Sequence, residues 1–165
     1  LMRSSAASDV YKRQSLQREA ANRYGFSAKR TLQLAQECYE KHKVLTYPRT
    51  DSRYLPEDYL GKVYGIVGAV AEENAEFAPF ARDILDNKRV KPNRRVFDTK
   101  KVSDHFAIIP TGKIEKLSGD VQKLFEMVMA RFLAVFFPPA VFEDTRRTTL
   151  IDPVSYTHLT LPTIA

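Results

Sequence analysis

Apolar residues recur with the 3.6-residue period of an α-helix in several parts of this 165-residue chain. The pattern predicts helices over residues 28–43, 56–73 and 118–137, and a shorter one over 79–86. Ser27 stands directly before the first of them, and serine is a preferred N-cap residue because its hydroxyl accepts a bond from a free backbone N–H. We therefore expect most of the core to be helical.

Fewer segments have the character of strands. Residues 142–151 are rich in β-branched side chains and are predicted to form a strand, and 44–47 and 95–97 are predicted to be short extended pieces. Residues 88–102 otherwise form a loop. The expected fold class is α+β, mainly α: a helix-rich domain that bears a tyrosine site, with winged-helix-like elements and a few short strands.

Composition limits the classes of protein to which this chain can belong. Hydrophobic residues make up 44% of it, too many for a disordered tail. No apolar run approaches the roughly 20 residues of a membrane span, so we expect no membrane partner. Cys38 is the only cysteine and cannot form an internal disulfide, and no metal-ligand spacing is present. These features predict a cytoplasmic protein without a disulfide partner.

The two ends differ from the centre. Residues 1–14 and 153–165 lack an amphipathic period and resemble translated sequencing-adapter sequence. We expect both to be non-native tails and exclude them from the fold. The meaningful part of the chain is then residues 15–152.

Candidate chemistry centres on Tyr47 and Arg49, two residues apart in a segment that Pro48 keeps out of a helix. A tyrosine hydroxyl can act as a covalent nucleophile, and a guanidinium can hold phosphate oxygens. An extended segment would put both side chains on one face. We therefore assign attack to Tyr47 and phosphate positioning to Arg49.

Three segments in order carry a family resemblance: residues 15–36, residues 45–55 (LTYPRTDSRYL) and residues 103–111 (SDHFAIIPT). Together they resemble type IA DNA topoisomerases, and the proline after the tyrosine is most similar to the topoisomerase III branch. The resemblance implies that one DNA strand is cut and resealed without ATP, through a 5′-phosphotyrosine intermediate on Tyr47. It also implies that His105 contacts the DNA near the cut, with Asp104 orienting it.

Positive charge gathers between these segments. Seven of the fourteen residues 88–101 are Lys or Arg, and one is acidic. Such a stripe attracts the phosphates of single-stranded DNA without reading sequence, although a solvated loop is the alternative. The predicted DNA-binding residues, with two cations from the first turn of the helix at 28, are Arg94, Arg95, Lys100, Lys101, Lys29 and Arg30.

The resemblance also indicates what this chain lacks. In the family, Mg²⁺ and the general acid are held by an acidic N-terminal domain, and no matching D-x-D-x-E cluster occurs here. We expect an internal fragment whose partner is the rest of the parent chain, which binds Mg²⁺, and expect the fragment alone to be inactive. The alternatives are a non-catalytic helical module that binds single-stranded DNA and a basic interaction domain, but neither needs a Tyr–Arg pair.

Overall fold

The computed structural model describes residues 9–138 with their side chains. It also describes the backbone of short strands at residues 2–3, 141–143, 146–151, 154–159 and 163–164. The chain divides into two compact units, one of residues Ser8–Phe137 and one that joins Leu1–Ala7 with Pro138–Ala165.

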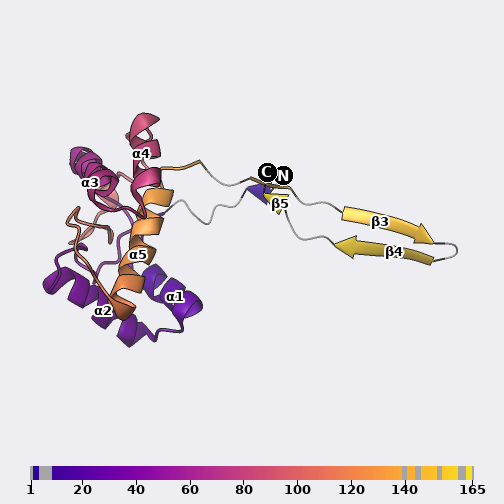
Figure 1. The fold of residues 1–165 in the computed structure, drawn as a ribbon, viewed down its shortest axis with the longest axis horizontal. Coiled ribbons are helices and arrows are strands. Elements are labelled where there is room, and N and C mark those ends of the chain that lie inside the picture. The colour runs from indigo at the N-terminus through magenta and orange to yellow at the C-terminus, as the bar shows by residue number, and fades with distance from the viewer. Residues whose placement is uncertain are drawn as a thin grey trace. The chain divides into compact units, whose positions relative to one another are not determined.

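The first unit is helical, which confirms the expected fold class (Figure 1). Helices α1, α2 and α5 pack together, α3 pairs with α4, and α4 contacts α5. The helices are α1 (Arg13–Tyr24), α2 (Ala28–Glu40), α3 (Leu60–Glu73), α4 (Ala78–Asp86) and α5 (Gly119–Ala134), with 3-10 turns η1 (Glu57–Tyr59) and η2 (Thr99–Lys101).

Helix α2 begins where the sequence predicts. The Ser27 hydroxyl accepts a bond from the Arg30 backbone N–H at 3.0 Å, which satisfies a donor that the helix leaves free. The buried face of α2 carries Leu34, Ala35 and Cys38. The helix ends at Glu40, three residues earlier than predicted, and this leaves a connection that carries the chain toward Tyr47.

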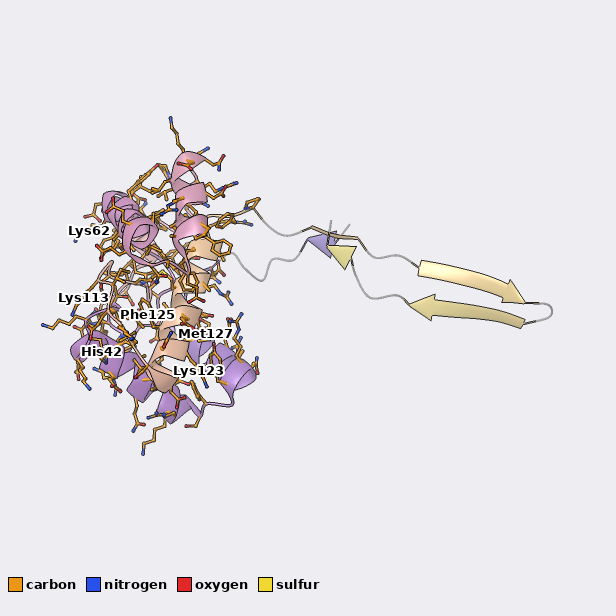
Figure 2. The ribbon with its side chains drawn as sticks, in the orientation of Figure 1. His42, Lys62, Lys113, Lys123, Phe125 and Met127 are labelled. Atoms are coloured by element: carbon orange, nitrogen blue, oxygen red, sulfur yellow. The ribbon has the colours of Figure 1, made fainter. Side chains whose placement is uncertain are left out.

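The core runs along α5. Seven of its residues are buried, among them Phe125 and Met127, which Figure 2 labels. Leu124, Val128 and Phe132 are each no more than 1% exposed. Burial of such side chains stabilises a fold by about 1.5–3 kcal/mol each, so α5 contributes much of the core, and α2 and α4 pack against it.

Two local predictions need correction. Residues 56–73 are not one helix but η1 followed by α3. The predicted extended pieces form only isolated bridges, an antiparallel one between Leu45 and Pro110 and a parallel one between Leu55 and Phe97. Helix α1 was not predicted, because its polar, charged surface gives little periodic signal.

The second unit consists of strands. β1 (Met2–Arg3), β2 (Val141–Glu143) and β5 (Thr163–Ile164) form one antiparallel sheet, and β3 (Arg146–Ile151) pairs with β4 (Val154–Leu159) in another. The predicted strand at 142–151 is therefore two strands.

We expected the folded part of the chain to begin after residue 14, but the helical unit begins at Ser8. Val10 and Tyr11 are 3% and 1% exposed, and the Tyr11 carbonyl accepts a bond from the Ile108 backbone N–H at 2.9 Å. Where these residues pack says nothing of their origin, so the non-native character of residues 1–14 and 153–165 stays a prediction. Within the described part of the chain, no helix has the length and apolar character needed to cross a membrane.

Burial of Cys38 gives a first test of the fold. The side chain is fully buried, and burial raises the pKa of its thiol to about 12. Because the thiolate is the reactive form, we expect native protein to resist a thiol-specific reagent at pH 8 and to react fully once unfolded in urea. Rapid reaction of the folded protein, with its helical circular dichroism intact, would contradict this packing.

Candidate active site

The rings of Tyr47 and His105 lie against each other. Their centroids are 4.1 Å apart with 35° between the ring planes. Tyr39 of α2 also meets the tyrosine edge-on, with centroids 5.4 Å apart. Tyr47 is half-buried and His105 is exposed, so this pair reaches solvent while the phenol contacts two rings. The structure thus brings together two residues that lie 58 positions apart and that sequence analysis assigned to one site.

Threonine hydroxyls hold the two segments in register. Thr46 donates to the Ala107 carbonyl and accepts from the Ile109 backbone N–H, both at 2.9 Å, and its own N–H donates to the Ile109 carbonyl at 3.0 Å. Thr50 donates to the His105 carbonyl at 2.9 Å. Both threonines are buried, so these bonds are shielded from water and fix the backbone on either side of Tyr47.

Arg49 does not continue an extended segment. The chain bends at Pro48 and Arg49, so Tyr47 and Arg49 do not lie on one face of an extended segment as expected. The exposed Arg49 side chain instead lines a hollow along α2, together with Lys29. Among the described residues Arg49 has no hydrogen bond or ion pair, which leaves its guanidinium available to an anion.

Two acidic residues stand close to the site residues in the sequence. Asp51 pairs with Arg13 of α1 at 3.5 Å. Asp104 is exposed, and in the described part of the chain it makes no hydrogen bond to His105. The orienting role predicted for Asp104 therefore has no contact to support it, and Thr50 positions the His105 backbone instead.

The basic loop 88–101 is anchored beside the tyrosine segment at two points. Ser52 donates to the Lys101 carbonyl at 3.1 Å, and Leu55 is bonded through its backbone to Val96 and Asp98. The side chains of the predicted DNA-binding residues are exposed beside these anchors: Arg94 and Arg95 precede the Leu55 anchor, and Lys100 and Lys101 lie at the Ser52 anchor.

The two predicted cations of α2 separate. Lys29 lines the same hollow as Arg49, whereas Arg30 pairs with Asp120 of α5 at 3.2 Å. Adjacent helix residues point about 100° apart, which explains why only one of them reaches the site.

Comparison with known proteins identifies the family. A sequence profile described as DNA topoisomerase matches residues 2–160. The chain belongs to the DNA topoisomerase family. The chain is 44% identical over 138 residues to DNA topoisomerase 3 of Bacillus cereus, covering 82% of this chain and 18% of the relative. It is 38% identical to DNA topoisomerase 3 of Vibrio cholerae, covering 86% and 22%.

A solved structure supports the same assignment. Full-length topoisomerase I from Thermotoga maritima superposes with a TM-score of 0.60 at 25% identity, covering 97% of this chain and 26% of that one. These matches confirm the type IA, topoisomerase III-like resemblance. The chain spans about a fifth of the length of the curated relatives it matches.

This topoisomerase segment contains a second tyrosine that sequence reasoning missed. The Tyr54 hydroxyl accepts a bond from Arg53 Nη2 at 3.3 Å, and the Lys101 ammonium lies 5.0 Å from its ring centroid. The Arg53 hydrogen bond lowers the pKa of the Tyr54 phenol, and the charges of Arg53 and Lys101 act in the same direction. In the sequence, the adjacent Arg53 and Tyr54 were the signal that could have identified this tyrosine. Tyr54 is therefore the natural rival to Tyr47 as a nucleophile.

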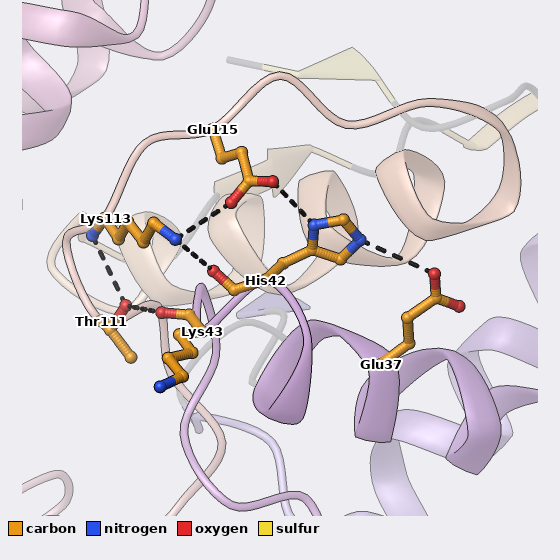
Figure 3. A network of polar contacts seen from close by, with 6 residues as sticks. All are labelled: Glu37, His42, Lys43, Thr111, Lys113 and Glu115. Atoms are coloured by element: carbon orange, nitrogen blue, oxygen red, sulfur yellow. Dashed lines mark hydrogen bonds and ion pairs between the residues drawn. The ribbon is translucent and has the colours of Figure 1, made fainter.

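A polar network ties the His105 segment to the end of α2 (Figure 3). His42 Nδ1 lies 2.9 Å from Glu115, and Nε2 lies 3.6 Å from Glu37. Lys113 bonds both the His42 carbonyl and Glu115, at 3.0 and 3.1 Å. Hydrogen bonds from His42 and then Lys113 lower the pKa of the Glu115 carboxyl. His42 thus has a structural role in this network.

No metal centre forms among the residues whose side chains are described: no group of three or more His, Cys, Asp or Glu is arranged to hold an ion. The described residues therefore provide no site for the Mg²⁺ that the resemblance implies.

The threonine contacts predict a measurable stability effect. Thr46→Val keeps the side-chain shape but leaves the Ala107 carbonyl and Ile109 N–H without their buried partner. We expect the free energy of unfolding, from urea titration, to fall by about 2–4 kcal/mol. Thr46→Ser keeps the hydroxyl and serves as the control. A loss in the valine variant no larger than in the serine variant would show that the hydroxyl does not hold the segments together.

Proposed function

We propose that this chain carries the nucleophile of a type IA DNA topoisomerase, and that the nucleophile is Tyr47. The longer protein would cleave one DNA strand, allow a second strand to pass and reseal the first, which relaxes or decatenates DNA. The observation that carries the proposal is the contact between Tyr47 and His105, held by two buried threonines. A half-buried phenol that contacts two rings has little conformational freedom, so little entropy is lost when its oxygen attacks.

The chemistry is an exchange of phosphodiesters. The Tyr47 oxygen forms a bond to phosphorus as the bond from phosphorus to the 3′ oxygen breaks. The phenol proton is lost and the 3′ oxygen gains one, so the step is balanced. Because one ester replaces another, no ATP is needed, and attack by the 3′ hydroxyl reverses the step. An intermediate of this kind keeps the 5′ phosphate on the tyrosine.

Two side chains are suited to the phosphate that Tyr47 attacks. Arg49 has no competing ion pair in the described part of the chain, so its guanidinium can hold two phosphate oxygens. A fixed cation of this kind stabilises the charge that develops during transfer. His105, against the Tyr47 ring, is within reach of the same phosphate. We assign Arg49 to phosphate positioning and His105 to contact with the strand.

The remaining parts of the reaction belong to the longer protein. We propose that Mg²⁺, and the acid that protonates the 3′ oxygen, come from residues outside those described here. The partner within the parent is accordingly the rest of its own chain. DNA in the cytoplasm is the substrate we infer, and the exposed cations Arg94, Arg95, Lys100 and Lys101 support a single strand as its form.

The alternative is a module that binds single-stranded DNA without chemistry. It is favoured by the same anchored basic loop, which binds strands whether or not a bond is cut. The two functions differ in one outcome, the formation of a covalent link.

Covalent capture tests the nucleophile. Residues 15–137 would replace the matching segment of the Bacillus cereus enzyme, which supplies the missing acids. Tyr47→Phe should abolish transfer of a labelled oligonucleotide to protein on a denaturing gel, since no oxygen remains to form the ester. Arg49→Ala should lower capture by about 10²- to 10³-fold without abolishing it.

Tyr54→Phe is the matched control and should leave capture intact. Each variant's thermal melt verifies folding, since loss of one hydroxyl changes little volume. Adduct that persists in Tyr47→Phe and disappears in Tyr54→Phe would transfer the role to Tyr54. Absence of any adduct from the unsubstituted chimera would favour the binding module.

A salt titration tests the basic loop. For the purified chain and a labelled oligothymidine, changing Arg94 and Arg95 to Ala should weaken binding and reduce the salt slope by about 1.4, or 0.7 for each lost phosphate contact. Changing Arg18 and Arg82 to Ala removes the same charge from exposed positions on α1 and α4 and should leave the slope almost unchanged. Equal slopes in the two double variants would make the loop a solvated surface.

A further inference from the structure

A hollow of about 520 Å³ runs along one side of α2. Its lining includes Lys29, Leu32, Gln33 and Gln36, at positions i, i+3, i+4 and i+7, so they form a single stripe of the helix. Arg49 contributes to the lining from the tyrosine segment.

The free charge in this hollow is positive. Glu37 is engaged by Lys41 at 3.7 Å and by His42 at 3.6 Å, and Glu40 accepts a bond from Gln36 at 2.8 Å. Lys29 and Arg49, by contrast, have no ion pair or hydrogen bond through their side chains among the described residues. Lys41 compensates Glu37, and Glu40 keeps its charge because the Gln36 amide is neutral, so with Lys29 and Arg49 the lining has a net charge of +1, which favours an anionic occupant.

The hollow borders the tyrosine. Tyr39 follows Leu32 by seven residues, which puts both on the same helix face. Leu32 lines the hollow, and the ring of Tyr39 meets Tyr47 edge-on at 5.4 Å. Leu32 and Tyr39 therefore link the hollow to Tyr47 along one face of α2.

We propose that the α2 hollow is a binding subsite for single-stranded DNA, in which Lys29 holds a backbone phosphate next to the one that Tyr47 attacks and Arg49 positions. The half-buried Leu32 and the aliphatic stems along the stripe contact the sugars and bases. The contacts are to phosphate, so the subsite does not read sequence. This inference rests on the proposed function, which it extends from the attacked phosphate to its neighbours.

Lys29 and Arg30 provide a matched test. They are adjacent, exposed and of equal charge, but Arg30 pairs with Asp120 outside the hollow. With the purified chain and a labelled oligothymidine, Lys29→Ala should weaken binding about fivefold near 0.1 M salt and reduce the salt slope by about 0.7. Lys29→Glu should weaken it further, and Arg30→Ala should change the slope by less than half as much as Lys29→Ala. Thermal melts confirm that all three variants fold.

The outcomes separate this subsite from the proposed function. Equal effects of Lys29→Ala and Arg30→Ala would overturn the subsite, whatever the capture assay shows. A Lys29→Ala chimera that melts at lower temperature but binds DNA normally would also overturn it, since the hollow would then hold another part of the parent chain. Selective loss of binding with no covalent adduct would support the subsite while the proposed nucleophile failed.

Discussion

One buried hydroxyl, that of Thr46, joins the two halves of the site. It donates to the Ala107 carbonyl and accepts from the Ile109 N–H, spanning 61 and 63 positions of the sequence. Buried backbone groups cost free energy when they lack partners, so this double contact specifies one register between the segments. Because the next residue is Tyr47, that register decides where the phenol points. Thr50 repeats the arrangement on the other side of the tyrosine, at the His105 carbonyl.

The chain between the Tyr47 and His105 segments brings positive charge to the tyrosine segment. It leaves through Leu55, forms the α3–α4 pair and returns as the basic loop, which is bonded to Leu55 and Ser52. The loop is therefore fixed near its end and within its length to the segment that carries the tyrosine. The loop is held there by backbone and hydroxyl contacts, while the side chains of Arg94, Arg95 and Lys100 are exposed. We propose that this surface attracts DNA and that the smaller site at Tyr47 acts on one phosphate.

Sequence alone predicted α2 and α5 well, because Ser27 and the apolar period of each helix are local signals. By resemblance it also assigned Tyr47 and His105 to one site, and the contact between them depends on bonds between distant segments. Helix α1 was not predicted, because few of its residues are buried, such as Leu16 and Ala20. The division between Lys29 and Arg30 could not be foreseen either, since it depends on Asp120, 90 positions further along. The environment of Tyr54 could not be predicted either, because Lys101 of the returning loop is part of it.

The most direct measurement is mass spectrometry of the trapped intermediate. The chimera would be mixed with oligonucleotide, quenched with denaturant, and digested with nuclease and trypsin. Cleavage after Lys43 and Arg49 releases residues 44–49, with Tyr47 as their only tyrosine, and cleavage after Arg53 releases Tyr54 in a separate peptide. The account predicts a nucleotide attached through its 5′ phosphate to the peptide 44–49. A nucleotide on the Tyr54 peptide, or on neither, would contradict it.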